Sequence, residues 1–237
     1  MRALVIDDER LARKELIKLL EDFPEIEILG EAANVDEAYE MINTHNPDLL
    51  FLDIQMPGKT GFELLEMLDA VPTVIFTTAY DEYALKAFEV NALDYLLKPI
   101  QMDRLNETIT KLEPPQPADE EEKEPKLGLS DQVFVKDGDK CWFVSLHDIR
   151  YFESDGNYIK VFFENFKPMI HKSLNALDEK LNDRDFFRAS RKHIINLSWV
   201  ESIEPWFNGG LMVKLKGGDK VEVSRRQAAK FKEKMSL

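Results

Sequence analysis

The feature that most constrains the fold of this chain is an uninterrupted apolar run, residues 49–52 (LLFL), that ends in Asp53. Four large apolar residues without polar alternation are typical of a strand buried on both faces, as in a parallel sheet covered by helices. Residues 56–58 (MPG) then end the strand and turn the chain. Asp53 precedes Thr60 by seven residues, too far to be the N-cap of the next helix. We therefore interpret Asp53 as a functional carboxylate at the C-terminal edge of the sheet, where open α/β sheets bind ligands.

Residues 1–112 alternate between strand and helix patterns. Besides the strand that ends in Asp53, apolar strands are expected at about 3–6, 26–29, 71–76 and 92–97, and helical spacing follows each of them. Five such units predict a parallel sheet with right-handed crossovers. The predicted fold class is therefore a doubly wound α/β domain of the flavodoxin-like kind, with strand order 2-1-3-4-5.

Polar residues follow four of these strands. Asp7 and Asp8 come after the first, Thr78 after the fourth and Lys98 after the fifth, so all should meet Asp53 at one edge of the sheet. Three gathered carboxylates repel one another unless a cation joins them, and an all-oxygen cluster favours Mg²⁺. Taken alone, Asp7 and Asp8 could simply complement the next helix. Together with the Lys98 charge and the Thr78 hydroxyl they predict a site for a tetrahedral anion, with Asp53 placed to become phosphorylated.

Four motifs in this half carry a resemblance to a known family: VIDDE at 5–9, LFLDIQMPG at 50–58, FTTAY at 76–80 and DYLLKPI at 94–100. Residues 1 to about 112 resemble the receiver domain of two-component response regulators. The resemblance implies that a sensor histidine kinase phosphorylates Asp53 in the presence of Mg²⁺. It also implies the supporting roles: Asp8, Asp53 and the backbone carbonyl of Gln55 bind the metal, Asp7 acts through water, Lys98 contacts the phosphoryl group, Thr78 moves onto it and Tyr95 reorients.

The net charge of −14 is unevenly distributed along the chain. Residues 1–112 carry −13 and residues 131–237 carry +3. Between them, residues 113–130 carry −4 and begin EPPQPADEEEKEPK, which has too few apolar side chains to bury a core. We expect an extended, self-repelling linker there. The predicted division is a first domain at 1–112, a linker at 113–130 and a second domain with a different partner at 131–237.

The second domain has the pattern of a mostly antiparallel β-rich fold, with short apolar strands, close glycine turns and two helices. Its histidines, His147, His171 and His193, fit no metal-binding spacing, and no catalytic motif is apparent. Cations gather in connecting segments at 188–192 and 225–226. A solvated surface is the plain explanation, but loops on a rigid scaffold are where contacts to partners concentrate, so nucleic acid remains an open alternative on composition alone.

Four further motifs carry a second resemblance: YFESDGNYIKV at 151–161, SLNALDEKL at 173–181, FFRASRKHIINL at 186–197 and VEVSRRQAAKF at 221–231. Residues from about 130 to 237 resemble a LytTR DNA-binding domain, whose loops enter successive major grooves. The implied DNA contacts are Asn157, Tyr158, Lys160, Arg191, Lys192, Arg225 and Arg226. The chain departs from the family motif because Ser190, Lys192 and His193 occupy its His, Ser and aromatic positions, so the base edges that it reads are left open.

The whole chain is thus expected to be a response regulator rather than an enzyme, binding double-stranded DNA at promoter repeats as an activated homodimer. Helices at about 81–89 and 103–112 are the expected dimer face. An aspartyl-phosphate phosphatase is disfavoured because Gln55, not an acid, stands two residues after Asp53; a receiver fused to a protein-interaction module is a further alternative. The single cysteine, Cys141, and the lack of an apolar run of about 18 residues predict a cytoplasmic protein without membrane insertion.

Overall fold

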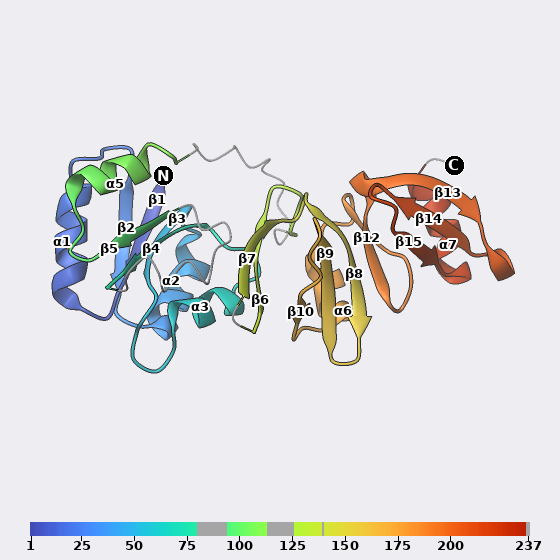
Figure 1. Cartoon of the computed structure of the whole chain (residues 1–237), viewed down its shortest axis with the longest axis horizontal. Helices are drawn as coiled ribbons and strands as arrows, with labels where there is room; N and C mark the ends of the chain where they lie inside the picture. Colours follow the sequence, from blue (N-terminus) through green and yellow to red (C-terminus); the bar gives the residue numbers. More distant parts are fainter. Residues whose placement is uncertain (80–93, 113–125, 139, 236–237) are drawn as a thin grey trace. The chain divides into compact units, whose positions relative to one another are not determined.

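The computed structural model describes residues 1–79, 94–112, 126–138 and 140–235. The expected helix at 83–88, and with it half of the expected dimer face, lies outside these residues. The chain divides into two compact units (Figure 1). Unit 1 consists of Met1–Glu120 and Gln132–Phe143, and unit 2 of Glu121–Asp131 and Val144–Leu237.

Unit 1 contains a five-stranded parallel sheet in the order β2-β1-β3-β4-β5. Its strands are β1 (Arg2–Ile6), β2 (Glu27–Ala32), β3 (Leu49–Asp53), β4 (Thr73–Thr78) and β5 (Asp94–Leu97), and its described helices are α1 (Arg10–Leu20), α2 (Val35–His45), α3 (Gly61–Met67) and α5 (Met102–Ile109). The predicted fold class and strand order are confirmed.

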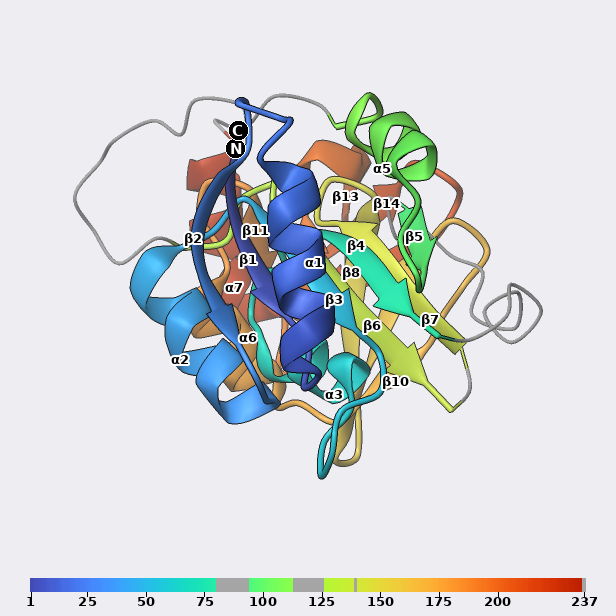
Figure 2. The ribbon, with the colours of Figure 1, turned by 90° about the vertical axis from the view of Figure 1, so that its left-hand side faces the viewer.

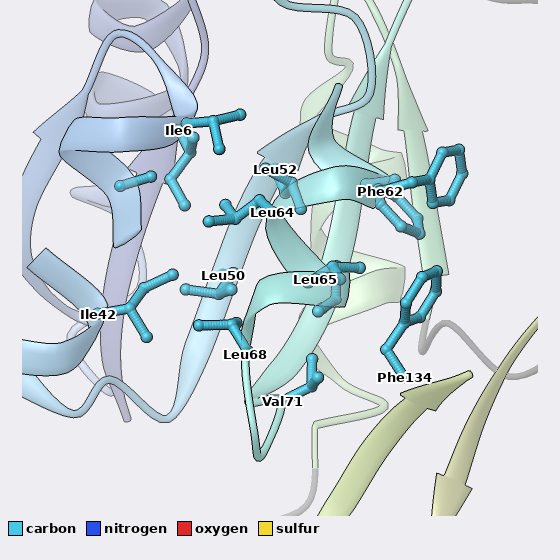
Figure 3. Close-up of a cluster of buried hydrophobic side chains, with 14 of the residues drawn as sticks. Ile6, Ile42, Leu50, Leu52, Phe62, Leu64, Leu65, Leu68, Val71 and Phe134 are labelled. Atoms are coloured by element: carbon cyan, nitrogen blue, oxygen red, sulfur yellow. The ribbon is translucent and has the colours of Figure 1, made fainter. Parts of the chain in front are cut away.

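Helices cover both faces of this sheet, which is why β3 has no polar alternation. On one face, Leu16 of α1 and Leu105 of α5 share a core with Phe51, and Figure 2 shows these two helices in front of the strands. On the other face, Ile42 of α2 packs in a core with Leu50 (Figure 3) and with residues of α3. Every residue of β3 is therefore buried, including Asp53.

Unit 1 also includes a two-stranded sheet, the β6–β7 hairpin, formed by β6 (Gln132–Asp137) and β7 (Lys140–Ser145). Phe134 and Phe143 of this hairpin belong to the core beneath α3, and Figure 3 shows Phe134 facing Phe62. Residues 132–143 thus cluster with unit 1, whereas the sequence predicts a second domain from residue 131. β7 spans the division, because unit 2 resumes at Val144.

Unit 2 is β-rich and antiparallel, as predicted. It contains a five-stranded sheet in the order β10-β9-β8-β12-β11 and a three-stranded sheet in the order β13-β14-β15. Its elements are β8 (Ile149–Asp155), β9 (Tyr158–Phe163), β10 (Met169–Ile170), α6 (Leu174–Lys180), β11 (Phe186–Arg188), β12 (His193–Asn196), η2 (Leu197–Trp199), β13 (Val200–Pro205), η3 (Phe207–Gly209), β14 (Leu211–Leu215), β15 (Lys220–Val223) and α7 (Arg225–Lys234).

Two fully buried residues show how the interior of unit 2 is packed. Phe231 of α7 is fully buried against Phe187, with ring centroids 5.0 Å apart. Asn196 is also fully buried, and its side-chain amide donates to the carbonyls of Leu146 (3.2 Å) and Ile149 (2.9 Å). Within the described residues, the structure has no helix that is both long enough and apolar enough to span a membrane.

Candidate functional site

Three carboxylates meet at the C-terminal edge of the parallel sheet. β1 and β3 are neighbours, with Ile6 opposite Leu52, so the residues that follow and end them, Asp7 and Asp53, lie side by side. Carboxylate oxygens of Asp7, Asp8 and Asp53 all lie within 4.8 Å of one another. Asp7 and Asp53 are buried and Asp8 is half-buried. The predicted acid cluster therefore exists, and its negative charge needs a partner.

Lys98 supplies that partner. It follows β5, and its Nζ lies 2.7 Å from a carboxylate oxygen of Asp7 and 2.7 Å from one of Asp53. Its backbone N–H donates to the carbonyl of Thr78 (2.8 Å), which fixes the chain beside the end of β4. Thr78 itself is fully buried at that strand end. The four strand-end positions predicted from the sequence thus converge at one place.

The electrostatics of the site are set by burial. Burial raises the pKa of Asp53, and its contacts with Lys98 only partly oppose this. Burial also disfavours the charged form of Lys98, but its ion pairs with Asp53 and Asp7 outweigh that and raise its pKa. At neutral pH the site therefore holds an ammonium group, and burial makes the Asp53 carboxylate more basic than one in water, which favours its action as a nucleophile.

The backbone of Asp53 packs closely against Gly61 at the start of α3. The N–H of Gln55 donates to a carboxylate oxygen of Asp53 (3.1 Å), and the N–H of Gly61 donates to the carbonyl of Ile54 (2.9 Å). A Cβ atom on Gly61 would clash with the Asp53 carbonyl oxygen. Glycine at the start of α3 is therefore required by this close approach. The capping box of Thr60 and Glu63 then begins the helix.

Arg13 is a functional-site residue that the sequence did not reveal. It is buried on α1 and donates to the carbonyls of Asp7 (2.6 Å) and Asp8 (3.3 Å), while its Nε pairs with Glu31 at 2.8 Å. It fixes the backbone that carries both acids. In the sequence it is one of several basic residues at helical spacing, and only the fold shows that it points inward.

Tyr95 lies on β5, opposite Phe76 in the neighbouring strand. Its half-buried ring packs against the core of α2, α3 and the hairpin. Arg104 of α5 lies over the ring, 6.0 Å from its centroid, and also forms an ion pair with Asp94. Lys111 bonds the same carboxylate at 2.6 Å. Arg104 and Lys111, which fall within the segment 103–112 of the expected dimer face, thus bind an acid of their own chain. The sequence did not predict this cluster of Asp94, Arg104 and Lys111.

The predicted DNA-contacting residues of unit 2 come together through backbone hydrogen bonds. The loop at 189–192 carries Arg191 and Lys192. The N–H of Ser154, at the end of β8, donates to the carbonyl of Lys192 (2.8 Å), and the N–H of Ser224, before α7, donates to the carbonyl of Ala189 (2.9 Å). The loop therefore links the β8–β9 turn on one side to the start of α7 on the other.

The side chains along this strip are mostly exposed. Asn157 occupies the β8–β9 turn, and Tyr158 beside it is 46% exposed and in edge contact with His171. Arg191, Lys192, Arg225 and Arg226 are exposed as well. Lys160 differs, because it is half-buried and its Nζ lies 2.5 Å from a carboxylate oxygen of Asp155.

Arg188 is a cation with an inward role. It donates to the carbonyls of Ser190 (2.6 Å), Leu174 (2.8 Å) and Arg191 (3.0 Å). Burial lowers the pKa of its guanidinium, although Asp178 partly opposes this. Arg188 therefore shapes the loop that presents its neighbours.

Family models match two parts of the chain. Residues 3–110 match the response regulator receiver domain, and residues 139–236 match the LytTr DNA-binding domain. The chain is 37% identical over 244 residues to the sensory transduction protein LytT of Enterococcus faecalis, and 32% identical over 245 residues to the transcriptional regulatory protein LytR of Staphylococcus aureus, covering all of each chain in both cases. This chain belongs to the LytTR-type response regulators.

Solved structures resemble each half of this response regulator. The response regulatory domain of mrkE from Klebsiella pneumoniae is 33% identical, with a TM-score of 0.42, and the match covers 47% of this chain and 94% of that one. A LytTr domain of a Bacillus cereus regulator is 23% identical, with a TM-score of 0.43, and the match covers 45% of this chain and 97% of that one. The two family matches given above, over residues 3–110 and 139–236, show that the regulator combines a receiver domain with a LytTR DNA-binding domain.

Two further features of the LytTR domain were not predicted. Trp206 and Phe207 form an exposed aromatic pair beside the start of α7, with ring centroids 4.7 Å apart. His193, which replaces the family's aromatic residue, lies edge-on to Tyr151 and bonds Ser190 at 3.3 Å. The sequence motif shows the substitution at 193 but not the contacts of His193. For the aromatic pair, the only signal in the sequence was a turn, indicated by the glycines at 209 and 210.

Proposed function

We propose that this response regulator is switched by phosphorylation of Asp53, and that the modification controls its dimerisation and its binding to specific promoter DNA. The observation that carries the proposal is Lys98, whose Nζ lies 2.7 Å from both Asp7 and Asp53 at one sheet edge. A half-buried ammonium beside a buried carboxylate can hold the anionic oxygens of a phosphoryl group next to the atom that attacks it. The donor is the phosphohistidine of a cognate sensor kinase.

In the transfer, a carboxylate oxygen of Asp53 attacks phosphorus, a P–O bond forms, and the P–N bond to the kinase imidazole breaks. Lys98 pairs with the incoming phosphoryl group, and the Thr78 hydroxyl moves to donate a hydrogen bond to it. The acid cluster suits Mg²⁺, because three carboxylates lie within 4.8 Å of one another and all donors are oxygen. Asp8, Asp53 and the Gln55 carbonyl would hold the ion, with Asp7 acting through water. When bound, Mg²⁺ neutralises negative charge on the transferred group.

The test of this step is labelling with a small phosphodonor and Mg²⁺, followed by mass spectrometry. One added phosphate is expected, and Asp53→Asn should abolish it. Asp36→Asn, which changes an exposed acid in a surface ion pair, is the matched control and should label normally. Equal labelling of the Asp53→Asn protein would refute the assignment.

DNA binding is proposed for the strip formed by the β8–β9 turn, the 189–192 loop and the start of α7. Exposed cations at Arg191, Lys192, Arg225 and Arg226 support it, and the first N–H groups of α7 add a favourable end for phosphate. Asn157 lies in the turn, and Tyr158 and Lys160 follow it on β9. Replacing Arg191 or Arg226 by Ala should weaken binding by about 1–3 kcal/mol if the side chain reads a base edge.

A phosphate-only contact would instead weaken binding on all sequences and reduce the salt slope by about one. Lys230→Ala, an exposed lysine further along α7, is the control and should bind as the wild type does. Normal affinity of both arginine variants, with the fold intact, would exclude this strip as the docking face.

Dimerisation is proposed to follow from the same switch. Movement of Thr78 toward the phosphoryl group vacates space that the Tyr95 ring can fill, which changes the surface of β5 and its flanking helices. Pairing of two receivers by two-fold symmetry would bring two DNA-binding domains to adjacent half-sites, with an avidity gain of about 10²–10⁴. Analytical ultracentrifugation with and without beryllofluoride tests this, and a chain that stays monomeric with Asp53 occupied would overturn it.

A further inference from the structure

We propose that the β6–β7 hairpin is an intramolecular latch on the receiver, and that phosphorylation of Asp53 loosens it. The latch occupies a surface of α3, β4 and the segment between them, made of Phe62, Glu66, Val71 and Phe76 and hereafter called the docking surface. The loosening step rests on the proposed function, whereas the docking is carried by contacts within unit 1.

The centre of the contact is an aromatic quartet, two rings from each side. Phe134 of the hairpin stacks on Phe62 of α3, with ring centroids 6.1 Å apart and planes 13° apart. Phe143 lies 6.2 Å from Phe76 of β4, and the two pairs are joined by contacts of 5.2 Å between Phe62 and Phe76 and between Phe134 and Phe143. Phe134 is only 8% exposed and Phe143 only 4%. Undocking the hairpin would therefore expose two large rings on each surface.

Polar contacts flank the quartet and fix its register. The N–H of Val71, just before β4, donates to the carbonyl of Gln132 at the start of β6 (2.8 Å). Lys136 pairs with Glu66 of α3 at 2.8 Å. Since a backbone hydrogen bond, an ion pair and an apolar centre all agree on one placement, the surface is specific for the hairpin of the chain itself.

The docking surface adjoins the switch residues of the receiver. Phe76 lies two positions before Thr78 on β4, directly opposite Tyr95 of β5 and Leu52 of β3. The Tyr95 ring packs against the same core as the quartet. If Thr78 moves to a phosphoryl group and Tyr95 follows it, the core beside Phe76 loses an aromatic neighbour, and the packing of the hairpin weakens.

The hairpin also leads directly into the DNA-binding domain. β7 continues without a break from Phe143, in unit 1, to Val144, where unit 2 resumes, and the match to the LytTr domain begins at residue 139. A docked hairpin therefore ties the start of that domain to the receiver. Once it is released, the connection depends on the acidic, proline-rich segment 113–130, which the sequence predicts to be an extended linker.

Hydrogen–deuterium exchange on the full-length chain tests the latch, with and without Mg²⁺ and beryllofluoride. We expect amides of residues 132–138 and 140–144 to exchange about tenfold faster with the phosphoryl mimic, a change in the range that coupled sites show. Slower exchange of residues 53–58 reports that the mimic is bound. If these residues slow but the hairpin does not change, the latch is refuted while phosphorylation at Asp53 stands. If residues 53–58 do not respond, the proposed phosphorylation fails, and the release step fails with it.

Variants separate docking from release. In the Phe134→Ser chain, hairpin amides should exchange fast even without the mimic, and the mimic should accelerate them little further. Phe166→Ser replaces an exposed aromatic residue of unit 2 and is the control, in which hairpin exchange should match the wild type. Lys136→Glu should also speed exchange in the hairpin, because it sets a second negative charge against Glu66, and Glu66→Lys in the same chain should restore protection. Fast exchange in the double charge reversal as well as in the single variant would overturn the pairing of these surfaces.

Discussion

Replacing Lys98 by Met should destabilise the receiver strongly in the absence of divalent cations. At an effective dielectric constant of about 20, each 2.7 Å contact of Lys98 with Asp7 or Asp53 corresponds to a gross attraction of about 6 kcal/mol. Each pair of carboxylates within 4.8 Å repels by at least about 3.5 kcal/mol on the same scale. Desolvation offsets much of the attraction, but removing one partner of a buried pair typically costs about 3–5 kcal/mol. We expect a loss of that size.

The assay is urea unfolding at neutral pH in EDTA, followed by tryptophan fluorescence and circular dichroism. Lys59→Met is the matched control, because Lys59 pairs with Asp36 at 2.6 Å but both side chains are exposed, 45% and 77%. Such a surface pair is worth about 0–1 kcal/mol, so the control should unfold almost like the wild type. Similar losses in the two variants would show that burial of the Lys98 pairs does not govern their strength.

Mg²⁺ gives the same prediction a second readout. Without the ammonium group, the three carboxylates should bind a divalent cation more tightly, since no resident charge competes with it. A given concentration of Mg²⁺ should therefore stabilise the Lys98→Met chain more than the wild type, because the gain grows with the ratio of ligand concentration to Kd. An equal gain in both chains would mean that the acids and Lys98 do not share one site.

Three further changes test other parts of the structure. Burial opposes ionisation of Asp94, but hydrogen bonds from Lys111 and other donors outweigh burial and lower its pKa. Asp94→Asn should therefore lower the free energy of unfolding by about 3 kcal/mol at neutral pH. This loss should shrink as the pH falls below 3.8 toward the lowered pKa, which urea unfolding at several pH values measures. Asn196→Ala should lower the free energy of unfolding by about 3 kcal/mol, because it leaves buried carbonyl groups without their hydrogen bonds. Thermal unfolding measures this, with Asn157→Ala at an exposed position as the control. Equal shifts of the melting temperature in the two variants would contradict the prediction. Burial lowers the pKa of His193, so the stability of unit 2 should fall as the pH drops from 6.5 toward that lowered pKa, and a His193→Phe chain that retains this dependence would disprove the assignment.

The receiver was largely predictable because its strongest signals are local. The apolar run before Asp53 and the acids after residue 6 each lie within one segment, and parallel strands align their C-terminal ends whatever the loop lengths. Convergence of Asp53 and Lys98 then follows from topology alone. The direction of a side chain such as Arg13 does not, because on an amphipathic helix a basic residue near the apolar boundary can face either way.

The second half was harder to predict for the same physical reason. Arg188 and Arg191 are two cations three positions apart, yet one binds carbonyl groups beneath the loop and the other is exposed. Their roles depend on strand pairing and on the position of α6, which no short pattern encodes. The position of Phe134 is a longer-range case, because an alternating strand shows which of its faces is apolar but not which core of the molecule receives that face.

The way Arg188 holds its loop has a consequence for redesigning DNA specificity. Within the 189–192 segment its guanidinium bonds only to main-chain oxygens, those of Ser190 and Arg191, and the hydrogen bonds that join this segment to Ser154 and Ser224 also use its backbone. The shape of the loop is therefore largely independent of the side chains at 191 and 192. A combinatorial library at these two positions, with Arg188 retained, should keep a common scaffold while varying the chemistry offered to the duplex, so changes in sequence preference among its members could be assigned to the varied side chains themselves.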